Sequence, residues 1–198
     1  MQLARAARRV LLERGAVGLR VKDIAAEAGL APSSVLYYYP DLDDLVLEVS
    51  RDAMHRYAER RAEAVHELDD PGEQLRLAIR LGVPTGPDDD DSRLLYELDA
   101  FTGASAAFGV LTSAYFDRQV ALYESILEAG AARGEFELTG RPRSIARGLV
   151  GMEDGLGLQV VIAHPAIDRD EAERILLDFA SAATGCEIAA VGGKSRVG

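Results

Sequence analysis

Apolar residues recur every three to four positions along nearly the whole chain, and no stretch alternates apolar and polar residues long enough for a convincing strand. A repeat near 3.6 residues places side chains on one face of an α-helix, whereas a repeat of two places them on one face of a strand. The chain of 198 residues is also long enough for one or two domains with a buried core. The sequence therefore predicts an all-α protein.

About nine helices are expected, because turn-forming residues interrupt the periodic pattern. They are expected over residues 3–14, from 21, over 32–39, from 42, and over 73–81, 92–101, 105–133, 144–164 and 168–184. Asp168 and Glu171 have the spacing of a capping box, and Gly185 is a C-terminal stop. Residues 84–91 contain two prolines, a glycine and four adjacent aspartates, so we expect a solvated loop without a binding role.

Charge is distributed unevenly along the chain. Residues 1–40 carry six Lys or Arg and three Asp or Glu, which gives a net charge of +3. The remainder carries 16 basic and 30 acidic residues, a net charge of −14, so the whole chain has −11. A strongly acidic surface disfavours nucleic acid, but a basic N-terminal head fits contact with phosphate. Any DNA binding is therefore expected from the head.

Several classes of protein are disfavoured. The longest uncharged run, Ala100–Phe116, is 17 residues, too short and too polar to cross a bilayer, and the N-terminus does not resemble a secretory signal. With one cysteine, Cys186, and three scattered histidines, we expect no internal disulfide, no metal site and no cofactor, and a reducing cytoplasm fits. The chain lacks the common motifs of nucleophilic, zinc-dependent and phosphate-binding enzymes, so an enzyme is not expected.

The stretch from Val21, VKDIAAEAGLAPSSVLYYYP, fits two short helices that cross at a tight turn. Ala25 is small where the helices approach, and Gly29 can adopt the left-handed conformation that ends the first helix. The apolar residues expected where the two helices face each other are Ile24, Ala28, Leu30 and Val35, and the aromatic Tyr38 is expected to complete this set. The pattern predicts a helix-turn-helix, in which the second helix enters the DNA major groove. An ordinary helical hairpin is the alternative.

The longer stretch RGAVGLRVKDIAAEAGLAPSSVLYYYPDLDDLV resembles the TetR family of transcriptional regulators over about the first 46 residues. Two later stretches, DRQVALYESILEAGAARGEF and EDGL, resemble the ligand-binding domain of the group that contains the choline-responsive BetI repressor. The resemblance implies a DNA-binding head over 1–46, a ligand-binding and dimerisation body over 47–185, and a flexible tail over 186–198.

Transferred by position, the resemblance implies that four residues face the DNA groove: Ser33, Ser34, Tyr37 and Tyr38. It also implies that Lys22 lies near a phosphate. Hydroxyl groups bond phosphates or base edges, and aromatic rings pack on thymine methyl groups. Tyr39 replaces the family's phenylalanine and is expected in the core. Leu42 stands where many members have a phosphate-contacting lysine, which predicts weakened DNA affinity unless Leu42 is simply buried.

The resemblance also places a homodimer interface on the last two helices, at Gly148, Gly151, Gly155, Leu158, Leu176 and Phe179. Each glycine in a helix costs about 1 kcal/mol relative to alanine, and close approach of another helix would offset that cost. Packing within one chain is the alternative explanation of these glycines.

A ligand pocket is implied in the body, and its candidate lining residues are Tyr96, Phe101, Phe108, Phe116, Asp117, Tyr123 and Met152. Glu97, Asp99, Glu153 and Asp154 are further candidate buried carboxylates. An aromatic cavity with several carboxylates would suit a cationic effector, whereas the same stripe could form ordinary core.

The sequence thus predicts a transcriptional regulator, a repressor that leaves double-stranded operator DNA when a small organic effector binds. The alternative is a dimeric sensor or protein-interaction module that has lost DNA binding.

Overall fold

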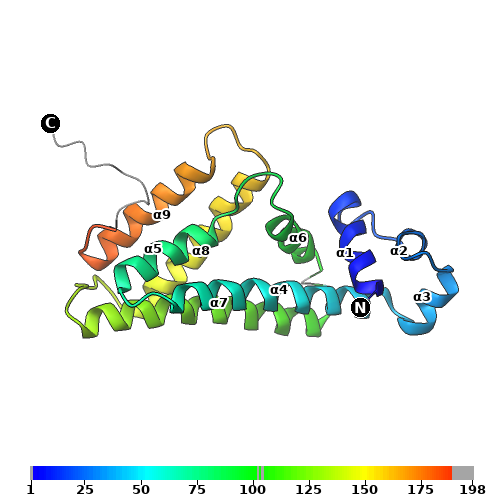
Figure 1. The fold of residues 1–198 in the computed structure, drawn as a ribbon, viewed down its shortest axis with the longest axis horizontal. Helices are drawn as coiled ribbons and strands as arrows, with labels where there is room; N and C mark the ends of the chain where they lie inside the picture. Colours follow the sequence, from blue (N-terminus) through cyan, green and yellow to red (C-terminus); the bar gives the residue numbers. More distant parts are fainter. Residues whose placement is uncertain (1, 102, 104, 189–198) are drawn as a thin grey trace. The chain divides into compact units, whose positions relative to one another are not determined.

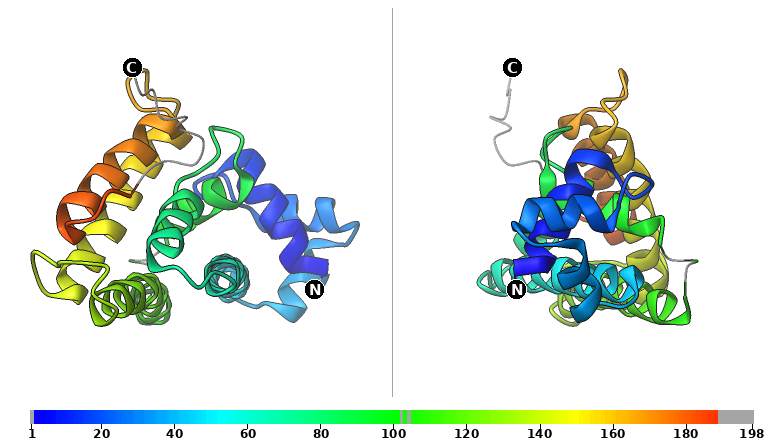
Figure 2. Two further views of the ribbon diagram at one scale, coloured as in Figure 1. Left: turned by 60° about the vertical axis from the view of Figure 1, so that its left-hand side comes forward. Right: turned by 90° about the vertical axis from the view of Figure 1, so that its right-hand side faces the viewer.

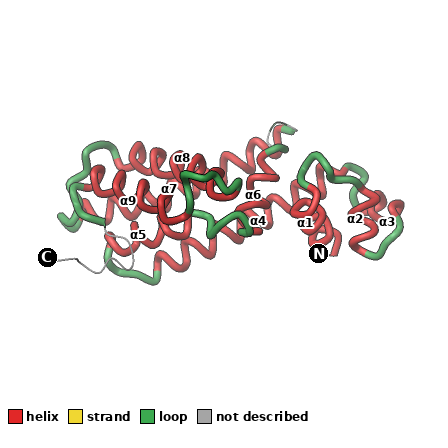
Figure 3. The backbone as a smooth tube through the Cα atoms, turned by 90° about the horizontal axis from the view of Figure 1, so that it is seen from above, coloured by secondary structure: helices red, strands yellow, loops and turns green. Residues whose placement is uncertain are grey.

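The computed structural model describes residues 2–101, 103 and 105–188, and this part of the chain is all α-helical, without a strand (Figures 1 and 3). Its nine helices are α1 Gln2–Arg14, α2 Val21–Ala28, α3 Pro32–Tyr38, α4 Leu42–His66, α5 Pro71–Gly82, α6 Asp90–Asp99, α7 Ala106–Ala132, α8 Pro142–Val161 and α9 Arg169–Thr184. The predicted fold class is confirmed. No helix in the described ranges is long and apolar enough to span a bilayer.

The described residues fall into two compact units: those up to Tyr57 together with those from Asp89 to Tyr115, and Ala58–Asp88 together with those from Phe116 onward. Both long helices, α4 and α7, contribute residues to each unit. Packing therefore groups α6 and the start of α7 with the N-terminal helices, which local sequence patterns do not reveal. The expected functional division after residue 46 stays a prediction.

The first unit is built around the apolar faces of α1 and α2, which pack against α3, α6 and the first turns of α4 and α7. Its core includes Leu3, Ala7, Leu11, Ile24, Val35, Leu45, Val49, Leu94, Leu98 and Phe108. Leu42 is half-buried and packs against this core, which agrees in part with the expected burial, and the predicted effect of Leu42 on DNA affinity stays a prediction.

Three polar contacts tie α6 to α1 and to the turn that follows α1 within the first unit. Arg8 Nη2 lies 2.7 Å from Asp91 Oδ1, Arg93 Nη2 donates to the Leu12 carbonyl at 3.1 Å, and the Ala16 amide donates to Glu97 Oε2 at 2.7 Å. Asp89 also accepts a hydrogen bond from the Ser92 amide at the start of α6. The expectation that the aspartates of 84–91 are only solvated is therefore wrong for Asp89 and Asp91, because α6 begins inside that run.

The second unit has its own core, formed by α5, α8 and α9 with the later parts of α4 and α7. Helices α8 and α9 lie side by side in Figures 1 and 2 and contact each other closely. Asp168 accepts from the Glu171 amide at 2.9 Å, and Gly185 has φ 65°, so the predicted N-cap and C-terminal stop of α9 are both confirmed. Helix α8 ends at Val161, before the expected His164, and Ala163 there has φ 54°.

The start of the expected flexible tail is packed. Ile188 is buried against the second core, and its amide donates to Ser181 Oγ at 2.9 Å. The expectation is thus wrong for 186–188, because the sequence after α9 contains an isoleucine that the core accommodates. Residues 189–198 of the expected tail lie outside the described residues.

Candidate functional site

The turn between α2 and α3 has the predicted helix-turn-helix geometry. Gly29 has φ 67°, and the amides of Gly29 and Leu30 bond back to the carbonyls of Ala26 and Ala25 at 3.1 and 2.8 Å. A left-handed residue costs little at glycine because there is no Cβ to clash with the next carbonyl. Pro32 then occupies the first turn of α3, where its missing amide removes no helical hydrogen bond.

The side chains between the two short helices match the expected pattern in part. Ile24, Ala25, Ala28 and Val35 are buried, as predicted. Leu30 and Tyr38 were also expected there, but they are 38% and 67% exposed. That expectation is wrong for both: Leu30 lies in the turn before α3, and Val35 is the single buried side chain of α3.

The outer face of α3 is unusually rich in exposed aromatic surface. Tyr37 is 80% exposed, and its ring meets the Tyr38 ring edge to face at 5.3 Å. Ser33 and Lys22 are also exposed, while Ser34 is half-buried. These five residues are the predicted DNA contacts, and all of them retain some accessible surface in the chain; their contact with DNA stays a prediction.

Tyr39 lies at the end of α3 and anchors it to α4. Its hydroxyl donates to Glu48 Oε2 at 2.5 Å, and the ring packs, half-buried, against the first core. The hydrogen bond to Glu48, together with burial and the negative charge of Glu48, raises the pKa of Tyr39 from 10.0 to about 12. Tyr39 therefore packs against the core, as expected, and its hydroxyl also forms a hydrogen bond with Glu48.

We expect this tyrosine to be detectable by titration. Because its folded-state pKa is raised, the contact stabilises the protein fully below pH 10 and loses that effect as the pH rises through about 12. The difference in tyrosinate absorbance between native protein and Tyr39→Phe isolates this tyrosine, and it should titrate near pH 12. Glu48→Gln should move that component to lower pH, and Tyr37→Phe is the matched control. A difference that titrates near pH 10 would contradict the assignment.

The predicted pocket residues are shared between the two units. In the first unit, Phe108 is buried and stacks on Phe101 at 5.9 Å between ring centroids, and Tyr96 is half-buried. In the second, Tyr123 is fully buried, and Phe116 and Met152 pack partly buried against the core. Phe101 and Phe108 thus form ordinary core contacts within their unit, which was the alternative expectation.

The candidate carboxylates differ sharply in burial. Asp117 is exposed and lies 3.5 Å from Arg143, so the expectation of a buried Asp117 is wrong: it falls on the outer face of α7. Glu97 is half-buried, Asp99 and Asp154 are exposed, and Glu153 is the one that is buried.

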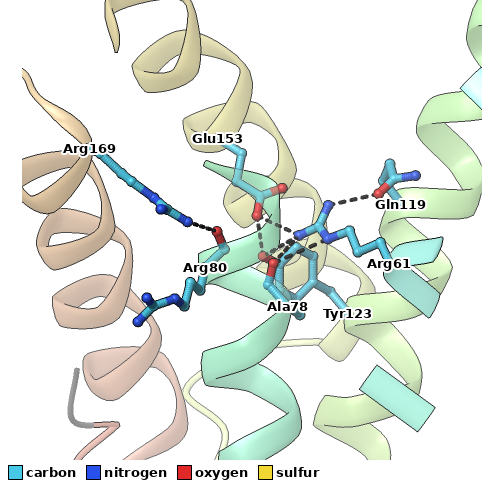
Figure 4. A network of polar contacts seen from close by, with 7 residues as sticks. All are labelled: Arg61, Ala78, Arg80, Gln119, Tyr123, Glu153 and Arg169. Atoms are coloured by element: carbon cyan, nitrogen blue, oxygen red, sulfur yellow. Dashed lines mark hydrogen bonds and ion pairs between the residues drawn. The ribbon is translucent and has the colours of Figure 1, made fainter. Parts of the chain in front are cut away.

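Glu153 belongs to a polar cluster that joins four helices at the centre of the second unit (Figure 4). Arg61 lies on α4 and Glu153 on α8, and Arg61 Nη2 is 2.6 Å from Glu153 Oε1. The same guanidinium donates to Gln119 Oε1 and the Tyr123 hydroxyl of α7, at 2.7 and 2.8 Å. The carbonyl of Ala78 on α5 accepts from Nη2 at 2.7 Å and from Nε at 3.2 Å.

The charges of this cluster are almost completely shielded from water. Arg61 is 4% and Glu153 6% exposed, and the Tyr123 hydroxyl donates to Glu153 Oε1. Burial raises the pKa of Glu153, while Arg61 and the Tyr123 hydrogen bond act in the opposite direction. The Arg61 guanidinium also lies over the Tyr123 ring, 5.1 Å from its centroid.

A glycine makes room for the carboxylate. At Gly82, the last residue of α5, an added Cβ would lie 1.9 Å from Glu153 Oε1 and 2.6 Å from Arg61 Nη2. Sequence reasoning did not single out Arg61, Gln119 or Gly82. A signal for Arg61 was present, because it continues the four-residue spacing of Val49, Ala53 and Tyr57 along one face of α4.

The predicted dimer residues separate into exposed and buried groups. Gly151 and Gly155 are exposed, and a Cβ added at either would meet nothing within 4 Å. Leu158 is 44% exposed and Ile162, which was not predicted, 62%. A Cβ at Gly148 would lie 3.3 Å from the Phe179 ring, so these two already pack together. Leu176 is fully buried, so its assignment to a dimer interface is wrong: it points into the core of its own chain.

A positive-φ glycine turn followed by a short, exposed second helix is the arrangement of a helix-turn-helix protein, and a second compact helical unit accompanies it in this chain. Residues 3–49 match the profile of bacterial regulatory proteins of the tetR family. Residues 71–185 match the profile of the C-terminal domain of BetI-type transcriptional repressors. The chain belongs to the TetR family, with a BetI-type C-terminal domain, and is a DNA-binding, ligand-responsive transcriptional regulator.

Relatives share the same arrangement over most of their length. The HTH-type transcriptional regulator BetI of Brucella canis is 23% identical over 180 residues, which cover 90% of this chain and 87% of BetI. A transcriptional regulator from Saccharomonospora viridis in complex with choline has a TM-score of 0.82 at 24% identity, covering 90% of this chain and 93% of its own. FadR from Bacillus subtilis in complex with stearoyl-CoA has a TM-score of 0.69 at 20% identity, covering 93% and 98%.

Proposed function

We propose that this regulator acts in the cytoplasm as a homodimeric repressor that leaves its operator when a small organic effector binds the helical body. The exposed face of α3 carries this proposal, because Tyr37 and Tyr38 present large aromatic surfaces directly after the turn that orients a recognition helix. Ser33 and Ser34 add hydroxyl groups beside them, and Lys22 supplies a positive charge at the start of α2.

Contact between α6 and α1 offers a route from effector to DNA. The Arg8–Asp91 pair and the hydrogen bond from the Ala16 amide to Glu97 attach α6 to the helix that supports the helix-turn-helix. An effector that favours one position of α6 over another would thereby favour one position of α1. The size of the response is limited by the difference in effector affinity between the two states.

The effector class is open between at least two chemistries. Choline, bound by the Saccharomonospora viridis regulator, is a cation, whereas stearoyl-CoA, bound by FadR, is an anion with a long acyl chain. Both relatives are under 25% identical to this chain, so they support effector binding in the body without choosing the effector.

DNA binding by this face is tested with two variants across a salt series. Tyr37→Ala should weaken the specific complex by about 1–3 kcal/mol if the ring contacts a base, and should change binding to random DNA little. Lys22→Ala should weaken both complexes alike and reduce the salt slope by about one per head, because one phosphate contact is lost. Tyr37→Phe, which keeps the ring, is the control. Equal losses on specific and random DNA for Tyr37→Ala would contradict groove contact, and the absence of a footprint would favour a sensor that no longer binds DNA.

The dimer is tested at an exposed stripe formed by Gly151, Gly155 and Leu158 of α8 and by Ile162 directly after it. A TetR-type reader of this size needs two copies to recognise a long operator. Leu158→Glu should convert the dimer to monomer, because it places a charge in an interface that would otherwise exclude water. Leu81→Glu is the matched control, since Leu81 of α5 is similarly exposed at 37%. Sedimentation equilibrium measures both, and an intact dimer in Leu158→Glu would exclude this stripe.

A further inference from the structure

The buried guanidinium of Arg61 lies in a site made of hydrogen-bond acceptors and one aromatic face. The acceptors are Ala78 O, Gln119 Oε1, Tyr123 Oη and Glu153 Oε1, and the ring of Tyr123 faces the charge at 5.1 Å. A carboxylate, neutral oxygens and a ring face are the groups with which proteins bind planar or alkylated cations. By its chemistry this is a cation site, and the cation in it is supplied by the chain.

The groups that form this site have supports that do not depend on Arg61. The Tyr123 hydroxyl donates directly to Glu153, and the missing Cβ of Gly82 leaves the space in which the carboxylate lies. Ala78 O belongs to the backbone of α5, and Gln119 and Tyr123 lie one helical turn apart on α7. Truncating Arg61 would therefore leave a shaped cavity with its acceptors in place.

We propose that these groups form a cation-binding site that Arg61 occupies from within, so that Arg61 determines effector specificity by excluding free organic cations from the centre of the body. The inference rests on the proposed effector-binding function for its biological meaning, although the occupancy of the site is tested without DNA. Among the buried residues of the described chain Arg61 is the one basic side chain, which is consistent with a single cation position.

Exclusion by Arg61 also bears on the choice of effector. A cationic effector could reach Glu153 and the Tyr123 ring only by displacing a side chain that is covalently attached and hydrogen-bonded to α5, α7 and α8. A tethered cation is present at a high effective concentration, which a free cation must exceed. The native protein should therefore not respond to free cations through this site.

Removing the side chain of Arg61 should leave a site that a free cation can occupy. Arg61→Ala deletes the atoms beyond Cβ, and ethylguanidinium reproduces those atoms, charge included. Ethylurea has nearly the same shape without the charge. At about ten times its dissociation constant, ethylguanidinium should raise the melting temperature of Arg61→Ala by about 3–6 °C. Ethylurea should raise it by much less, and native protein should gain from neither.

A second variant separates the site from general effects of the probes. In Arg61→Ala/Glu153→Gln the cavity remains but the carboxylate does not, so the stabilisation by ethylguanidinium should be lost. If Arg61→Ala is unfolded in buffer alone, ethylguanidinium should restore its helical circular dichroism signal by mass action, and ethylurea should not.

The outcomes decide the proposal. It is overturned if both probes stabilise Arg61→Ala equally, if neither stabilises or refolds it, or if the double variant responds as strongly as the single one. Since melting and circular dichroism are the readouts, a failure here leaves operator binding through Tyr37 and Lys22 untouched, and a failure of operator binding leaves this result untouched.

Discussion

Glu153→Ala should lower the free energy of unfolding by about 3–5 kcal/mol, because it leaves the buried cation of Arg61 without this counter-charge. The guanidinium is 4% exposed, so water cannot replace the lost carboxylate oxygen at 2.6 Å. Since whole domains are stable by about 5–15 kcal/mol, this single change should bring the protein close to unfolding. Urea unfolding at one fixed protein concentration measures the effect.

The control for this variant is an arginine–glutamate pair at the surface. Arg143 Nη1 lies 2.8 Å from Glu124 Oε2, but the two side chains are 48% and 21% exposed. Glu124→Ala should therefore cost about 0–1 kcal/mol. A double-mutant cycle should also show strong coupling in the buried pair: Arg61→Met/Glu153→Met should cost much less than the sum of the single changes. Additive costs would mean that the pair is not a unit.

Because of the same cluster, the stability of Arg61→Ala should depend on pH differently from the stability of native protein. Burial raises the pKa of Glu153, and Arg61 opposes that rise, so removing Arg61 should raise the pKa further. A carboxyl with a raised folded-state pKa stabilises the fold at low pH and loses that contribution as the pH rises. The deficit of Arg61→Ala relative to native protein should therefore be smaller at about pH 5 than at about pH 8. A deficit that grows on acidification would contradict the assignment.

Gly82→Ala should destabilise the protein by about 1–3 kcal/mol, opposite in sign to the usual effect of this change in a helix. Alanine in place of glycine normally gains up to about 1 kcal/mol through helix propensity. Here the new Cβ would lie 1.9 Å from Glu153 Oε1, and the carboxylate cannot move without breaking its contacts with Arg61 and Tyr123.

Two further variants identify the cause. Gly109 of α7 has nothing within 4 Å of an added Cβ, so Gly109→Ala should stabilise by up to about 1 kcal/mol. In the Glu153→Ala background the nearer obstruction is absent and only the 2.6 Å approach to Arg61 Nη2 remains, so the cost of Gly82→Ala should fall. A cost that is undiminished without Glu153 would show that this carboxylate is not the cause of the strain.

Local patterns in the sequence were sufficient where the interactions themselves are local. The 3.6-residue repeat predicts each helix because a helix buries one of its own faces. Gly29 and Gly185 mark helix ends, and Asp168 caps α9 through the amide of Glu171, three residues away. The helix-turn-helix could be predicted for the same reason, since its turn and both of its short helices lie within 20 consecutive residues.

The errors concern residues whose surroundings come from distant parts of the chain. Leu176 and Leu158 look alike in an apolar helix, yet only packing decides that Leu176 enters the core and Leu158 stays accessible. Asp91 looks like one member of a solvated acidic run until α6 brings it against Arg8, 83 residues earlier. Helical periodicity defines an apolar face without stating which other helix, or which copy of the chain, will cover it.

The sequence by itself determined the fold class and the helix-turn-helix, because those depend on short-range periodicity, capping and turn chemistry, and its resemblance to known regulators implied the family. Only the tertiary structure decided the cluster at the centre of the second unit. Arg61 and Glu153 are 92 residues apart, and Gly82 lies between them on a third helix. A buried ion pair exists only where folding removes both charges from water and brings them within hydrogen-bonding distance, and that depends on how four helices pack together.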